Sequence, residues 1–140
     1  MVAGNLLGVP LTTTDIDIVH RRTPDNVARL RAVLCEIGAR YQLRRDLAPQ
    51  DSHLAGRGHN LLLTKYGRLD VLGAIGDDQD YDQLLPHSVA IELEPGLTIR
   101  VIDLPTLIRL KEQAGREKDI AALPHLRRTL AERRKRGLDP

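Results

Sequence analysis

The stretch Thr14-Asp15-Ile16-Asp17-Ile18-Val19 alternates acidic and β-branched apolar residues. This alternation predicts a β-strand over 14–19, in which Asp15 and Asp17 share one face and the two isoleucines share the other. The strand rise predicts a separation of roughly 6–7 Å between the Cβ atoms of the two aspartates. Carboxylate oxygens at this spacing suit one hard divalent cation, or two neighbouring ones.

A helix is predicted directly after this strand. Thr23 is a typical N-cap residue, Pro24 suits the first helical position and Asp25 favours the first turn. Apolar residues then recur at a spacing of three and four until Gly38, which predicts the end of the helix. The apolar stripe consists of Val27, Leu30, Val33, Leu34 and Ile37. The single cysteine, Cys35, is placed on the apolar side of this helix and is expected to be packed and inert.

The rest of the chain predicts further strands and helices in mixed order. They are strands over 60–65 and 68–72 that meet at Tyr66-Gly67, a short helix near 81–85, strands over 89–92 and 97–101 around Pro95-Gly96, a helix capped by Asp103, and a helix over 116–136 that Pro124 is expected to break or kink. We therefore expect a single α/β (α+β) domain over 1–140, in which helices pack on a small mixed sheet.

A third acidic residue lies within a predicted strand, in Leu69-Asp70-Val71. If the strands of Asp70 and of Asp15 and Asp17 are neighbours, three carboxylates converge on one face of the sheet. Magnesium sites for phosphoryl chemistry are built from a few carboxylates, with substrate phosphates completing the shell. The alternative is an acidic, solvated strand face with no chemistry.

The amino-acid composition excludes several classes of protein for this chain. Among 140 residues, 41% are hydrophobic and 29% are charged, which is typical of a globular chain. Only three tyrosines and no other aromatic residues are present, which counts against a base-stacking nucleic-acid platform. One cysteine excludes an intrachain disulfide or a cysteine-cluster zinc site and favours a cytoplasmic location. No apolar run approaches the roughly 20 residues of a membrane span, so we expect no membrane partner.

Positive charge is concentrated at the end of the chain. The net charge is +2, yet residues 126–140 hold six basic and only two acidic side chains. A basic helical segment on a slightly acidic body predicts a contact with a polyanion such as RNA. The alternative is a solvated helix end, because cations are favourable near a helix C-terminus.

The order of these motifs resembles the nucleotidyltransferase (polymerase β-like) superfamily. That family has an apolar-Gly-[Gly/Ser] turn, about ten residues, an Asp-apolar-Asp-apolar strand and a later apolar-Asp-apolar strand. Here Ala3-Gly4-Asn5 is followed after nine residues by Asp15-Ile16-Asp17-Ile18, and later by Leu69-Asp70-Val71. Leu107-Ile108-Arg109-Leu110-Lys111 and the segment 114–119 resemble the C-terminal signature of AbiEii-type minimal bacterial nucleotidyltransferases, which include toxins of toxin–antitoxin systems.

The resemblance implies a role for each matching residue. Asp15 and Asp17 are expected to bind Mg2+, with Asp70 as the third carboxylate that helps to deprotonate the attacking hydroxyl. The residues expected to contact the nucleotide are Gly4 and Asn5 through their backbone amides, and Lys111, Arg116 and Lys118 through their charges. The alternative for the cations is a solvated helix surface on which Asp119 pairs with Arg116 or Lys118.

These expectations define two functions. The first is a metal-dependent enzyme that moves a nucleoside monophosphate from an NTP to a hydroxyl of RNA, protein or a small molecule, with an antitoxin as a further partner. The second is a non-catalytic binding or regulatory module of the same fold that contacts RNA through its basic tail. It is motivated by Asn5 at a position where the family has Gly or Ser, and by the three residues that precede Gly4. Because so short a segment leaves a strand edge uncovered, we also expect a homodimer.

Overall fold

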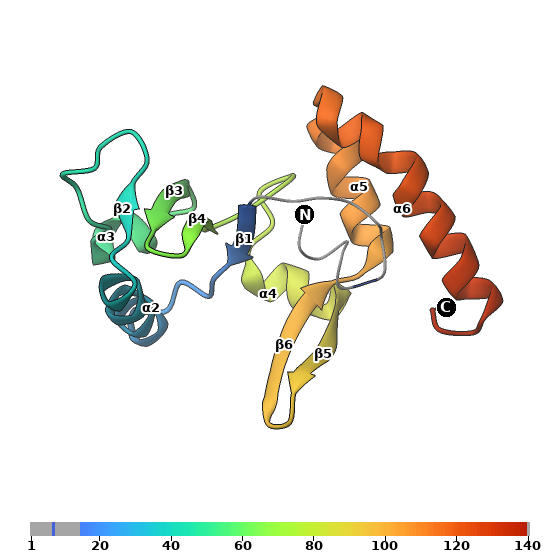
Figure 1. The fold of residues 1–140 in the computed structure, drawn as a ribbon, viewed down its shortest axis with the longest axis horizontal. Helices are drawn as coiled ribbons and strands as arrows, with labels where there is room; N and C mark the ends of the chain where they lie inside the picture. Colours follow the sequence, from blue (N-terminus) through green and yellow to red (C-terminus); the bar gives the residue numbers. More distant parts are fainter. Residues whose placement is uncertain (1–6, 8–14, 140) are drawn as a thin grey trace. The chain divides into compact units, whose positions relative to one another are not determined.

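The computed structural model of the protein describes Leu7 and residues 15–139 (Figure 1). It has a mixed α/β architecture, which confirms the predicted fold class. The elements are β1 (Asp15–Val19), α2 (Pro24–Glu36), β2 (Arg40–Tyr41), α3 (Asp51–Leu54), β3 (His59–Thr64), β4 (Gly67–Leu72), α4 (Tyr81–Leu84), the 3-10 turn η1 (Leu85–His87), β5 (Ser88–Glu94), β6 (Leu97–Ile102), α5 (Leu104–Ala114) and α6 (Glu117–Lys135). The strands form two small sheets rather than one, of four and two strands.

The chain divides into two compact units, each of which is described by itself. One spans 13–83, and the other combines 84–140 with the N-terminal 1–12. We call them the sheet unit and the helical unit.

The sheet unit contains the strand order β1-β4-β3-β2. β3 and β4 form an antiparallel hairpin in which Thr64 pairs with Gly67. β1 pairs with β4 in the parallel direction, so the chain between them must cross over, and α2 lies within this crossover. The register aligns Ile16 with Leu69, Asp17 with Asp70, and Ile18 with Val71.

The core of the sheet unit lies between α2 and one face of the sheet. Its buried side chains are Val27, Leu34, Ala39, Leu54, Leu62 and Val71, and Ile18, Leu30, Ile37, Tyr41 and Leu69 pack against them. The predicted stripe is therefore confirmed at four of its five positions. The exception is Val33, which is 52% exposed. Cys35 is exposed as well, so the prediction that this cysteine is packed is wrong. Each neighbours the buried Leu34 and projects about 100° away from it around the helix.

The helical unit combines the β5–β6 hairpin with α5 and α6 around a second core. The side chain of Asp103 accepts a hydrogen bond from the amide of Thr106 at 2.8 Å, which confirms the predicted cap of α5. Gly115 ends α5 with a φ of 62°. α6 continues through Pro124, so the predicted break is absent, and the alternative of a kink stays a prediction. Pro124 removes the donor to the carbonyl of Ile120, but Ile120 is 56% exposed, so water has access to that side of the helix.

Among the described residues, no helix combines the length and apolar character needed to cross a membrane.

A close approach of two backbone segments closes the sheet unit beyond the end of β4. The amide of Gly73 donates to the carbonyl of Gly58 at 3.0 Å. A Cβ atom at Gly73 would lie 2.1 Å from the carbonyl oxygen of Gly56 and 2.7 Å from the Cα of Arg57. Both contacts are with backbone atoms, so only glycine fits at position 73.

We predict that Gly73→Ala lowers the free energy of unfolding by about 1–3 kcal/mol, because the backbone at 56–57 must move to admit the methyl group. Gly58→Ala is the matched control, since a Cβ at position 58 meets no atom within 4 Å. Urea denaturation of both variants measures the difference. Equal stability of the two variants would contradict the close approach.

Candidate functional site

The parallel pairing of β1 with β4 brings three carboxylates to one face of the sheet. Asp17 lies directly opposite Asp70, and Asp15 precedes Asp17 by two residues on the same strand face. This is the arrangement that the sequence predicts if the two strands are neighbours. We call Asp15, Asp17 and Asp70 the carboxylate face.

The electrostatics of this face bear most strongly on Asp70. Burial raises the pKa of the Asp70 carboxyl, and the negative charges of Asp17 and Asp15 and a hydrogen bond with Asp17 raise it further. The positive charge of His59 acts in the opposite direction. Asp70 therefore holds a proton more readily than an isolated aspartate does, and a bound cation would relieve the repulsion that acts on it.

His59 is a residue of this site that the sequence analysis missed. It lies on β3 opposite Leu72, two positions along from the Leu61–Asp70 pair, so it shares the face of Asp70. Its Nε2 atom lies 3.0 Å from the carbonyl oxygen of Ala74, to which it donates when protonated there. No local pattern singles out His59, because no metal-ligand spacing relates it to the other histidines of the chain.

The type of ligand favours a metal ion at this face, but the arrangement of the side chains does not. Three carboxylates supply the hard oxygen ligands that Mg2+ prefers. Within the described part of the chain, however, no group of three or more His, Cys, Asp or Glu side chains is arranged to hold a metal ion. The predicted nucleotide contacts Gly4 and Asn5 lie outside the described residues. Mg2+ binding therefore stays a prediction.

Two of the three predicted cations of the helical unit, Lys111 and Arg116, converge on one buried acid. Asp119 is 0% exposed; its Oδ1 accepts from Lys111 Nζ at 2.9 Å and its Oδ2 from Arg116 Nε at 2.6 Å. Burial would raise the pKa of Asp119, but the hydrogen bonds and charges of Arg116 and Lys111 outweigh it and hold this pKa below its usual range. Lys118 is exposed. The expected alternative of an ion pair with Arg116 is thus present, and Lys111 joins it, so both cations have a structural role.

The basic tail is partly neutralised within the helical unit. Arg127 donates to Glu112 on α5, and Arg133 is paired with Asp139. Arg128, Lys135 and Arg136 are exposed along α6 and beyond its end. This surface retains positive charge, although less than the sequence alone indicates.

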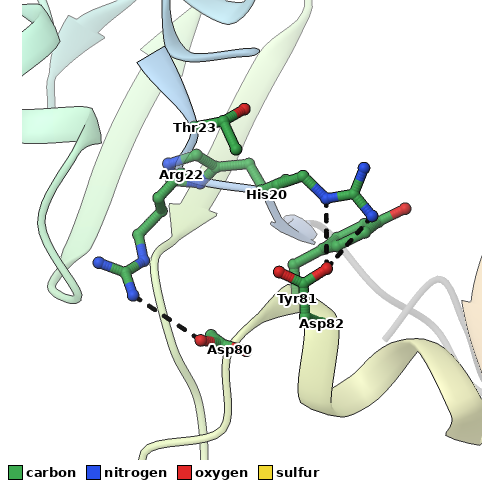
Figure 2. Close-up of a pocket in the computed structure, with 7 residues that line it drawn as sticks. His20, Arg22, Thr23, Asp80, Tyr81 and Asp82 are labelled. Carbon is green, nitrogen blue, oxygen red and sulfur yellow. Dashed lines mark hydrogen bonds and ion pairs between the residues drawn. The ribbon is translucent and has the colours of Figure 1, made fainter. Parts of the chain in front are cut away.

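A cavity lies beyond the carboxyl end of β1, within the sheet unit (Figure 2). Its volume is about 250 Å³, and it is lined by His20, Arg21, Arg22, Thr23, Asp80, Tyr81 and Asp82. Thr23 is the N-cap of α2, as predicted, but its side chain makes no capping hydrogen bond. No sequence pattern identified this cavity, since its two walls are about 60 residues apart in the chain.

No protein-family model and no curated protein matches this chain. The functional interpretation therefore depends on the geometry of its residues.

We predict that Asp70→Asn stabilises the protein at neutral pH, because it removes a charge that the folded state disfavours. A carboxyl with a raised pKa in the folded state reduces stability above that pKa and has no effect below its unfolded value of about 3.9. The gain in melting temperature should therefore be present at pH 7 and disappear toward pH 3. A gain that does not vary with pH would contradict the repulsion among the three carboxylates.

We predict that Lys111→Met lowers the free energy of unfolding by about 1.5–3 kcal/mol, because Asp119 loses a charged hydrogen-bond donor while it stays buried. Lys118→Met makes the same substitution at an exposed position and should change stability by less than about 0.5 kcal/mol. Urea denaturation compares the two. Equal effects would show that the Lys111–Asp119 pair contributes no net stability.

Proposed function

We propose that the protein is a metal-dependent nucleotidyltransferase that transfers a nucleoside monophosphate from an NTP to a hydroxyl acceptor. The observation that carries the proposal is the in-register pairing of Asp17 with Asp70, with Asp15 on the same face. Three carboxylates held by two paired strands are a rigid set of oxygen ligands, as positioning chemistry requires.

Each carboxylate has a role in the proposed reaction. Asp15 and Asp17 would hold Mg2+, which supplies positive charge against the phosphates of the NTP. Asp70 accepts the proton of the acceptor hydroxyl as its oxygen bonds to the α-phosphorus and pyrophosphate leaves. A carboxyl with a raised pKa is a stronger base than an ordinary aspartate, which suits Asp70 to that transfer.

The family resemblance also implies a role for cations of the helical unit, which is described by itself. Lys111, Arg116 and Lys118 would offset phosphate charge, as the family resemblance implies. Lys118 is exposed and the Arg116 side chain is 61% exposed, so both are accessible to a ligand. Lys111 would act while it is held by Asp119. An RNA or protein acceptor, an antitoxin partner and a homodimer belong to the same proposal.

A second candidate function is a non-catalytic binding or regulatory module. It is favoured by the lack, among the described residues, of a group of side chains arranged around a metal ion. The exposed basic side chains of α6 would then provide the contact with RNA.

The test compares Asp17→Asn with Asp25→Asn, an exposed aspartate outside the carboxylate face. If the wild type binds Mg2+ with a Kd of about 1 mM, 10 mM Mg2+ should stabilise it by about 1.4 kcal/mol. We expect this stabilisation, and the labelling of an acceptor from NTPs that carry the label in the α-phosphate, in the wild type and in Asp25→Asn. Asp17→Asn should lose both.

Three outcomes separate the candidate functions. Labelling that persists in Asp17→Asn would overturn the assignment of the site. NTP binding with no labelling of any acceptor would favour the non-catalytic module. Wild-type protein that is folded but unaffected by Mg2+ and by NTP would overturn the nucleotidyltransferase proposal.

A further inference from the structure

The cavity beyond β1 has two walls with different chemistry (Figure 2). The segment that joins β1 to α2 provides His20, Arg21, Arg22 and Thr23, and the segment that begins α4 provides Asp80, Tyr81 and Asp82. One wall thus presents mainly hydrogen-bond donors and the other mainly acceptors. Both belong to the sheet unit.

The acceptor wall is held in place by contacts outside the cavity. Arg57 donates from Nε to Asp78 Oδ1 at 2.7 Å and from Nη2 to the carbonyl of Asp78 at 2.5 Å. Asp78 has a φ of 60°, a left-handed conformation that few residues other than glycine adopt. The close approach at Gly73 fixes the start of the same loop. A site whose walls are already ordered loses little entropy when a ligand binds.

His20 presents an unsatisfied acceptor at this cavity. The residue is 6% exposed, and its Nε2 lies 2.6 Å from the carbonyl oxygen of Leu54. Because a carbonyl only accepts, Nε2 carries the proton and Nδ1 is left as an acceptor. Nδ1 has no hydrogen-bond partner in the described part of the chain. Nδ1 is itself inaccessible to solvent, so a ligand group reaches it only after a small movement of the ring or of its surroundings. An N–H or O–H donor that does so would be stabilised, because a buried polar atom without a partner is unfavourable.

Asp80 accepts from the amide of Gln83 through Oδ1 at 3.1 Å, and its Oδ2 lies 3.6 Å from Arg57 Nη1, outside the cavity. Arg22 and Asp80 are only 24% and 28% exposed, yet Nη2 and Oδ2 are 3.8 Å apart, which is too far for a hydrogen bond. Arg21 is closer to Asp82, at 3.2 Å. Two cations and two anions cancel, so the cavity does not select a bare phosphate. It is complementary to a neutral group that carries donors and acceptors side by side.

The cavity also has a flat wall. The guanidinium carbon of Arg21 lies 4.7 Å from the centroid of the Tyr81 ring, which places the cation over the aromatic face. Guanidinium planes and aromatic rings are the surfaces on which unpaired bases stack. A stacking surface beside mixed donors and acceptors favours a planar ligand over a flexible one.

We propose that this cavity binds a single unstacked nucleobase. The base would stack on the Arg21–Tyr81 pair, donate to His20 and Asp80, and accept from Arg22. The scarcity of aromatic residues argues against an extended base-stacking surface, but one base requires only one such pair.

The choice of a nucleobase rests on the proposed function. His20 follows Asp17 by three residues, so their Cα atoms are at most about 11 Å apart. A nucleotide with its base in the cavity is therefore long enough to bring its phosphates to the carboxylate face.

The experiment uses nucleosides, because they carry no phosphate and need no metal. Adenosine, guanosine, cytidine and uridine are titrated into the full chain without Mg2+, and amide and imidazole NMR signals of residues 20–23 and 80–82 are followed. At least one nucleoside should shift these signals in the wild type. Tyr81→Leu should weaken its binding by about 5–100-fold, as expected when one base loses its stacking partner.

Tyr66→Leu is the matched control. Tyr66 also lies beside a cation, with Lys65 Nζ 5.2 Å from its ring centroid, but it is exposed on the β3–β4 hairpin and does not line the cavity. Its substitution should leave nucleoside binding unchanged. Equal losses in the Tyr81 and Tyr66 variants would overturn the proposal.

Two further results would also overturn it. One is the absence of shifts at about 10 mM nucleoside, where a site with a millimolar Kd is mostly filled. The other is a response of the same signals to free amino acids and not to nucleosides, which would assign the cavity to a small zwitterion.

The test is independent of the proposed catalysis. Nucleoside binding should persist in Asp17→Asn, which lacks a ligand of the carboxylate face. Nucleoside binding without NTP-dependent labelling would overturn the transferase and retain the base site. Labelling without nucleoside binding would overturn the base site and retain the transferase.

Discussion

The parallel pairing of β1 with β4 is the contact on which both the carboxylate face and the sheet core depend. It places Asp17 opposite Asp70 on one face, and Ile18 opposite Val71 on the face that packs against α2. A slip of one residue would send the isoleucines to the outer face and bury the aspartates. Burying two carboxylates in an apolar core is prohibitively unfavourable, so the hydrophobic core and the acidic site enforce the same register.

Because the core and the acidic site require the same register, the sheet tolerates a cluster of like charges. Burial of the Asp70 carboxyl and repulsion by Asp17 and Asp15 raise its pKa and oppose folding. The burial of Val71, Leu62 and Leu34 on the other face favours folding. The core therefore stabilises a strand pairing that the charges alone would disfavour. Functional sites often contain such locally unfavourable arrangements, held by the packing around them.

The sequence predicts those features that depend on neighbouring residues. The β1 strand, the start of α2 and the Asp103 cap all follow from local patterns. Two predictions fail because the surroundings of a residue, not its neighbours in sequence, decide them. Cys35 is exposed because α2 buries a narrower stripe than its composition indicates. The break at Pro124 is absent, and the exposed Ile120 shows that water has access to the side of the helix where the hydrogen bond is lost. The cavity and the Lys111–Asp119 pair join residues through tertiary contacts, whereas the Arg116–Asp119 pair is local and was expected. Local periodicity carries no information on those tertiary contacts. His59 is different: the hairpin register places it near Asp70 once the predicted strand over 60–65 is extended by one residue to position 59.

The buried Asp119 has a consequence for how α6 responds to ionic strength. Its contacts with Lys111 and Arg116 hold the first turn of the helix, and because Asp119 is inaccessible to solvent, dissolved ions screen them weakly. The Arg127–Glu112 pair is exposed and is screened strongly. Added salt therefore weakens the Arg127–Glu112 contact, whereas the contacts of the first turn with α5 are little affected. Amide hydrogen exchange along α6 is then graded: slow near Asp119, and faster toward Lys135 as the salt concentration rises.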